Sequence, residues 1–92
     1  MIKSFRDKET ENIFRRIRVK QFEAISDTAF RRLRYLNRAI SLNDLSAIPG
    51  HHLEKLKDDR EGQYSIRIND QYRICFDWVG GDALNVEITA YH

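Results

Sequence analysis

The sequence predicts an α+β protein in which two N-terminal helices pack on one face of a small antiparallel β-sheet. Three observations support this fold class. A short alternating segment and two helical segments come first, every later segment alternates like a strand, and the links between those strands are short. The only proline, in "AIPG", marks the change from helices to strands. We therefore expect residues 1–92 to form a single domain.

The N-terminal segment is expected to hold a short strand and a first helix. Residues 2–5, "IKSF", alternate apolar and polar side chains as strands do. Asp7 is a candidate N-cap, acidic residues follow in the first turn, and Ile13 and Ile17 lie on one apolar side. This pattern predicts a helix over roughly 8–18.

A second helix is predicted to begin at Ser26 or Asp27. Its apolar residues recur at helical spacing and share one narrow arc, made of Ala29, Leu33, Leu36 and Ile40. The opposite arc carries an arginine stripe, made of Arg31, Arg34 and Arg38. One face of this helix should pack on the sheet, and the other should meet water or a phosphate-rich partner.

Four strands follow, in "HHLEKL", "QYSIRIN", "YRICFDW" and "ALNVEITAY", separated by the turns "KDDREG", "DQ" and "VGGD". Because strand side chains alternate between faces, the apolar set should face the helices. This predicted core set comprises Tyr64, Ile66, Ile68, Ile74, Phe76, Trp78, Leu84, Val86 and Ile88. The remaining set defines the open face of the sheet: Ser65, Arg67, Asn69, Arg73, Cys75, Asp77, Asn85, Glu87, Thr89 and Tyr91.

Composition is that of a globular protein, with 41% hydrophobic and 33% charged residues. No apolar run suggests a secretory signal or a membrane span, so we expect a cytoplasmic protein without a membrane partner. Residues 1–40 hold eleven Lys or Arg against five Asp or Glu, a net +6, whereas residues 41–92 carry a net −4 from five against nine. The basic half fits either a polyanionic partner or a solvated helix face. Cys75, the only cysteine, is expected to be a packed free thiol.

The open face gathers side chains that suit phosphate chemistry. Arg67 and Arg73 lie on adjacent predicted strands. Further basic or aromatic residues precede and follow them in the chain: His51, His52, Lys55, Lys57, Arg60, Tyr91 and His92. Guanidinium groups match phosphates, and imidazole exchanges protons near neutral pH, so the set is suited to RNA cleavage. A simply solvated polar face remains the alternative. A metal site at "HH" is disfavoured, because adjacent strand residues point to opposite faces.

The run "LKDDREGQYSIRINDQYRICF" together with "NVEITAYH" resembles the HigB family of toxins, within the RelE/ParE superfamily. The resemblance implies a RelE-like microbial RNase fold and the toxin of a type II toxin–antitoxin pair. It also implies a ribosome-dependent endoribonuclease that cleaves mRNA in the ribosomal A site without a metal or other cofactor. The implied partners are a HigA-like helix-turn-helix antitoxin, the ribosome with its 16S rRNA, and mRNA. Operator DNA would be bound only through the antitoxin complex.

The resemblance also assigns roles to residues. Lys57 and Arg73 match phosphate-binding positions, and Tyr91 and His92 match the family's "YH" terminus, which makes these four the expected catalytic residues. The arginine stripe is implied to contact the ribosome. The expected RNA-binding residues are Arg67, Arg60, His52, His51 and Lys55.

Two positions depart from the family pattern. Ala90 stands where an acidic residue commonly precedes "YH", and Glu54 stands where some members have a histidine. If the acid orients the terminal histidine, this chain is slower or uses another partner such as Glu87. These departures leave open a second hypothesis: a catalytically impaired homologue that acts mainly as an antitoxin-binding module in operon autoregulation.

Overall fold

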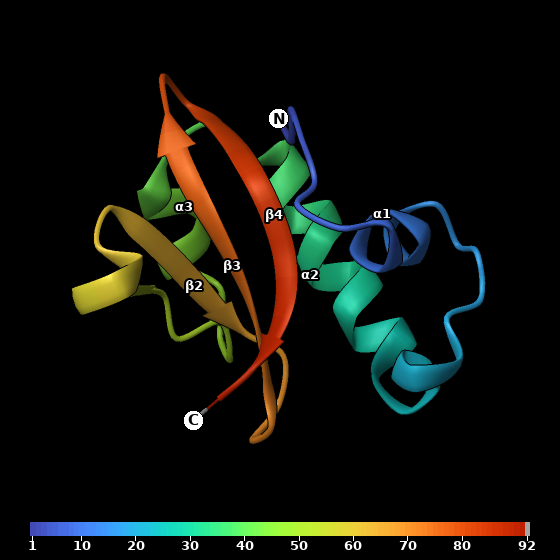
Figure 1. Ribbon diagram of the computed structural model, residues 1–92. Helices are drawn as coiled ribbons and strands as arrows, with labels where there is room; N and C mark the ends of the chain where they lie inside the picture. Colours follow the sequence, from blue (N-terminus) through green and yellow to red (C-terminus); the bar gives the residue numbers. More distant parts are fainter. Residues whose placement is uncertain (92) are drawn as a thin grey trace.

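The computed structural model describes residues 1–91, apart from the side chain of Asp58. Its antiparallel sheet has the order β1-β2-β3-β4, formed by β1 (Glu54–Lys55), β2 (Gln63–Arg67), β3 (Tyr72–Val79) and β4 (Asp82–Ala90). The helical elements are α1 (Lys8–Phe14), η1 (Lys20–Ile25), α2 (Ser26–Arg38), α3 (Leu42–Ser46) and η2 (Asp58–Arg60). Figure 1 shows α1 and α2 against one side of the sheet, which confirms the predicted α+β arrangement. No helix in residues 1–91 is long and apolar enough to cross a membrane.

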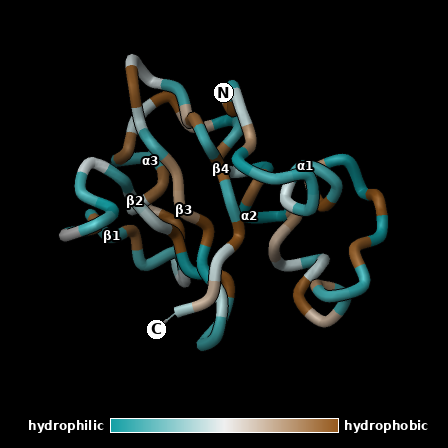
Figure 2. Tube along the Cα trace, viewed as in Figure 1, coloured by the Kyte–Doolittle hydropathy of each residue, from teal (hydrophilic) through white to brown (hydrophobic). Residues whose placement is uncertain are grey.

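The core lies between the sheet and the helices, as the alternation predicts. Fully buried side chains from the two layers include Leu33 and Leu36 of α2, Ile66 of β2, and Ile74 and Phe76 of β3. Hydrophobic and hydrophilic positions alternate along much of β4 in Figure 2. The sheet therefore has one face under the helices and one face without a helical layer.

The first helix is shorter than predicted. Asp7 caps it by accepting a hydrogen bond from the Thr10 amide at 2.7 Å, but the helix ends at Phe14 instead of continuing to residue 18. Arg16 adopts a left-handed φ of 62°, and the Ile17 amide donates a hydrogen bond to the Asn12 carbonyl at 2.8 Å. This is a Schellman-type ending with arginine in the position that glycine usually occupies.

The predicted opening strand pairs with the sheet only at single bridges. Ile2 bridges Ala83 and Phe5 bridges Val86, both in parallel orientation, so residues 2–5 run beside β4 without forming a named strand. The Thr10 hydroxyl accepts a hydrogen bond from the Ile88 amide at 2.9 Å, which ties α1 to the same strand. The N-terminal segment thus closes the edge of the sheet beside β4.

The second helix begins at Ser26 as predicted and buries Ala29, Leu33 and Leu36 completely. The prediction for Ile40 is wrong, because the helix ends at Arg38 and Ile40 is 82% exposed. Ala39, in extended conformation at the C-cap, enters the core in its place.

The segment between α2 and β2 also differs from the prediction. Ser41 and Asp44 form a capping box that starts α3, a helix that was not predicted from the sequence. The strand predicted over "HHLEKL" is reduced to the two residues of β1, and His52 has a left-handed φ of 45°. The signal for α3 was present in the sequence as the Ser-x-x-Asp spacing at its start.

A β-bulge in β4 changes which residues face the core. Cys75 pairs with Glu87, but Asp77 pairs with Leu84, so β4 contains one extra residue between these pairs. Asn85 takes a left-handed φ of 54° at this point. The prediction that Leu84 is a core residue is therefore wrong, and Ala83 is fully buried instead.

Candidate active site

The open face carries two arginines directly opposite each other. Arg67 of β2 and Arg73 of β3 are Cα partners in the antiparallel register. Like charges at such positions repel, because their side chains lie on the same face about 5 Å apart at Cβ. Arg67 pairs with Asp70 in the β2–β3 turn, and Arg73 Nε is buried without a hydrogen-bond partner among the described residues. The pair therefore forms a positive site suited to an anion.

Tyr91 lies against this arginine pair. Its amide donates to the Gln71 carbonyl at 2.8 Å, which holds Tyr91 beside the β2–β3 turn. The Arg73 guanidinium lies 5.2 Å from the centre of the Tyr91 ring, within cation–π range. Burial raises the pKa of Tyr91, although the charges of Arg73 and Arg67 act in the opposite direction. The ring is a neutral phenol that can stack or donate a hydrogen bond, and it lies on the face that alternation predicted.

The middle of the open face is buried even though no helix covers it. Ser65 and Cys75 are Cα partners with 1% and 0% exposure. Burial raises the pKa of the Cys75 thiol, against the lowering effect of Arg73 and Arg60. The prediction of a packed free thiol is confirmed. Glu54, the partner of Ser65, is exposed on this face and adds to the rise in the pKa of Tyr91.

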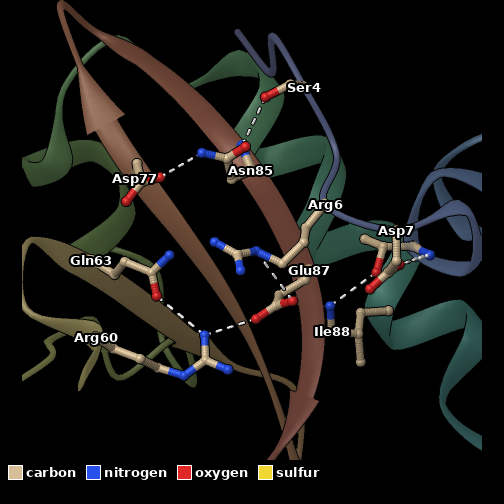
Figure 3. Close-up of polar contacts among 10 residues, drawn as sticks. Ser4, Arg6, Asp7, Arg60, Gln63, Asp77, Asn85, Glu87 and Ile88 are labelled. Atoms are coloured by element: carbon tan, nitrogen blue, oxygen red, sulfur yellow. Dashed lines mark hydrogen bonds and ion pairs between the residues drawn. The ribbon is translucent and has the colours of Figure 1, made fainter.

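A salt-bridge cluster extends from Glu87, the β4 partner of Cys75, toward the other end of the open face; it is drawn in Figure 3 and called the Glu87 clamp here. Arg60 Nη1 donates to Glu87 Oε1 at 2.7 Å and to Gln63 Oε1 at 3.1 Å. Arg6 Nε approaches Glu87 Oε2 at 3.5 Å from the N-terminal segment. The hydrogen bond that Arg60 donates to Glu87 raises the pKa of Arg60. Sequence reasoning placed Arg60 in the site but missed Arg6 and Gln63, because no local pattern links these three segments.

The predicted lysines lie beside η2. Lys55 and Lys57 are exposed and line a cavity of about 430 Å³ together with Leu56 and Glu61. Leu56 is buried, although it is outside the main core, and its amide bonds the Gln63 carbonyl at 2.9 Å. The structure therefore places the two lysines along the β1 side of the sheet.

The three histidines have different placements. The prediction that His51 binds RNA is not supported, because its side chain is fully buried against Tyr35, at 5.6 Å between ring centres. Its Nδ1 lies 3.2 Å from the Leu45 carbonyl, and burial together with the charge of Arg32 lowers the pKa of His51 to about 4. His52 is exposed. His92 lies outside the described residues.

The predicted ribosome-binding arginines form a separate surface on α2. Arg31, Arg34 and Arg38 are exposed, as the helical pattern predicted. Arg34 lies 5.8 Å from the centre of the Phe30 ring, and Arg38 lies 5.4 Å from the centre of the Tyr35 ring. This α2 arginine surface combines positive charge with partly exposed aromatic rings.

The fold is shared with solved toxin structures. The YoeB–YefM toxin–antitoxin complex from Staphylococcus aureus contains a chain that superposes with a TM-score of 0.61 at 22% identity, covering 100% of this chain and 98% of that chain. The protein thus has a RelE-like microbial RNase fold, with a phosphate-suited pair of arginines on its open sheet face.

Comparison with known sequences defines the family. The family described as "RelE-like toxin of type II toxin-antitoxin system HigB" matches residues 3–92, and the chain belongs to it. The chain is 31% identical to Endoribonuclease HigB of Proteus vulgaris over 100% of both sequences. It is 44% identical to Toxin HigB-1 of Vibrio cholerae over 62 residues, which span 67% of this chain and 65% of that relative. The resemblance inferred from "LKDDREGQYSIRINDQYRICF" and "NVEITAYH" is confirmed.

Proposed function

We propose that this protein is a ribosome-dependent endoribonuclease that cleaves mRNA in the ribosomal A site and thereby inhibits translation. The observation that carries the proposal is the opposed pair Arg67 and Arg73 with Tyr91 beside it. A phosphate stabilises two guanidinium groups on one face when the carboxylate beside them is solvated, as Asp70 beside Arg67 is, and the aromatic ring is placed to stack on an adjacent base. The similarity to Endoribonuclease HigB of Proteus vulgaris supports the assignment.

In the proposed reaction, the 2′-hydroxyl gives its proton to a water molecule, and its oxygen attacks the neighbouring phosphorus. The bond from phosphorus to the 5′-oxygen then breaks, leaving a cyclic phosphate and a 5′-hydroxyl. Arg73 and Lys57 neutralise the charge that develops on the phosphoryl oxygens. Tyr91 positions the substrate, and His92 transfers a proton to the departing oxygen. The RNA on either side contacts Arg67, Arg60, His52 and Lys55, and no metal or cofactor takes part in this scheme.

The proposed partners follow from the family and from the surface charge. A HigA-like helix-turn-helix antitoxin holds the toxin inactive, and the pair contacts operator DNA through the antitoxin. Arg31, Arg34 and Arg38 meet 16S rRNA in the ribosome, since exposed guanidinium groups beside aromatic rings suit an RNA surface. The proposed site of action is the cytoplasm.

The experiment is cleavage of an mRNA bound to purified ribosomes, with and without the antitoxin. We expect cuts at A-site codons that require ribosomes and disappear when the antitoxin is added. A folded, antitoxin-free protein that leaves the ribosome-bound mRNA intact would disprove the proposed activity.

A second candidate function is favoured by Ala90, which pairs with Tyr72 in the sheet and supplies no carboxylate next to His92. In this case the protein is an impaired toxin that mainly binds the antitoxin and tunes operator repression. The variant His92→Ala separates the two functions. It abolishes growth arrest and cleavage if the protein is a nuclease, and changes neither growth nor operator binding if it is only a binding module.

A further inference from the structure

The Glu87 clamp borders a polar cavity of about 520 Å³ at the end of the open face. Its lining is formed by Arg6, Asp59, Arg60, Glu61, Gln63 and Asp77. Three carboxylates face two guanidinium groups, so the lining has a net negative charge. A phosphate is poorly suited to such a lining, whereas a group that presents N–H donors suits it well.

The cavity and the arginine pair lie on one line along β3. Arg73 and Asp77 are four residues apart on the same face of a strand without a bulge of its own, a separation of roughly 13 Å at about 3.3 Å per residue. Arg60 and Arg6 lie between them over the buried Cys75. An RNA strand with its reacting phosphate at Arg73 could therefore extend along β3 and place a base in the cavity.

Asp77 is held in place by the bulge in β4. Asn85 Nδ2 donates to Asp77 Oδ2 at 2.8 Å, and the Asn85 amide donates to the Ser4 hydroxyl at 2.8 Å (Figure 3). Asn85 makes both contacts with its backbone in the left-handed region, at a φ of 54°. Bulges commonly redirect a side chain near an active site, and this one fixes the orientation of a carboxylate at the cavity wall.

We propose that this cavity is a nucleobase subsite, in which Asp77 accepts a hydrogen bond from the exocyclic amino group of an RNA base near the reacting phosphate. Adenine, cytosine and guanine offer such an amino group, and uracil does not. Asp77 is then a specificity-determining residue. The inference rests on the proposed function, because it assumes that RNA is the substrate.

A binding experiment tests the subsite without requiring cleavage. The isotope-labelled protein is titrated with 2′-O-methyl RNA hexamers of cytidine or of uridine, which cannot be cut through the 2′-oxygen. We expect the amide signals of Gln63, Asp77 and Asn85 to shift with the cytidine hexamer and to move little with the uridine hexamer. The variant Asp77→Asn should remove this difference, whereas the matched control Asp82→Asn, at the start of β4, should keep it. Shifts confined to Arg67 and Arg73, or equal shifts with both hexamers, would overturn the proposal.

Cleavage of ribosome-bound mRNA with a randomised A-site codon provides the second measurement. Asp77→Asn should change the preference for amino-bearing bases at one position by about 10-fold or more, since one well-placed base contact has that effect. A lower rate with an unchanged preference, or the same change in Asp82→Asn, would also overturn the proposal. A wild-type protein that binds the hexamers at the cavity yet cuts no RNA would contradict the proposed function and leave the subsite intact.

Discussion

The two ends of the open face contain the same kinds of residues, but only one of them pairs its arginines with a buried carboxylate. At one end Arg67 and Arg73 oppose each other, and the nearby Asp70 has a side chain that is 98% exposed. At the other end Arg6 and Arg60 meet Glu87, whose side chain is only 12% exposed. A solvated carboxylate neutralises its partner weakly, whereas a buried one holds it in a fixed geometry. The burial of the acid thus decides how strongly each arginine is held inside the protein, and Arg67 and Arg73 are the ones most available to a reacting phosphate.

The largest effect is expected from the variant Arg73→Ala. Removing the guanidinium beside Tyr91 should lower ribosome-dependent cleavage by about 100- to 1,000-fold, the cost typical of losing one donor to a developing charge. Stability should change little, since the opposed charge at Arg67 is relieved at the same time. Single-turnover cleavage and circular dichroism measure the two quantities.

Arg15→Ala is the matched control for this variant, because Arg15 is exposed at the C-cap of α1 and pairs with Glu11 at 3.1 Å, away from the open face. Its cleavage rate should equal that of the wild type. If a folded Arg73→Ala variant cleaved as fast as Arg15→Ala, the arginine pair would not be the phosphate site.

Burial also makes the stability of the protein depend on pH through His51, whereas the neighbouring His52 is exposed. Its pKa is lowered to about 4 in the folded protein, below the usual 6.5. Between these values the unfolded chain binds a proton that the folded protein does not. The contribution of His51 to the free energy of unfolding is therefore fully present above pH 6.5 and is lost as the pH decreases toward 4. The loss should reach at most about 3 kcal/mol.

Urea unfolding at pH 7, 6, 5 and 4 measures this effect. The variant His51→Gln should flatten the slope of the free energy of unfolding against pH, and His52→Gln should leave that slope unchanged. Carboxylates contribute equally in all three proteins, so the comparison isolates His51. A wild-type slope in His51→Gln would mean that another group causes the pH dependence.

Glu87→Ala is expected to have the next largest effect, on stability. The substitution leaves Arg60 and Arg6 without their shared carboxylate, which should lower the free energy of unfolding by about 1–3 kcal/mol. It should also speed alkylation of the buried Cys75, which lies under the clamp. Urea unfolding and thiol labelling report the two changes, and unchanged values in both would show that the clamp has no structural role.

The sequence predicted the arginine pair more successfully than the clamp, for a physical reason. Arg67, Arg73 and Tyr91 lie on consecutive strands joined by short turns, so alternation alone places them on one face. The clamp joins Arg6, Arg60 and Glu87 from three distant segments, and no periodic pattern reports such contacts.

Local backbone features explain the remaining differences from the sequence prediction. The left-handed residue Asn85 shifts the register of β4, which moves Leu84 out of the core. The short β1 leaves His51 free to turn toward α2 instead of the open face. A non-glycine residue with positive φ is difficult to foresee from residue type, because most side chains avoid that region.

The smallest effect is expected from Asp70→Asn at the arginine-pair end. Because the Asp70 carboxylate is almost fully exposed, removing its charge should change the free energy of unfolding by less than about 0.5 kcal/mol. It should, however, free Arg67 and raise affinity for a non-cleavable RNA about 2- to 5-fold at low salt. The gain should vanish at high salt, since exposed charges are screened there. Fluorescence anisotropy at two salt concentrations measures this, and a gain of equal size at both would mean that Asp70 does not act on Arg67 through its charge.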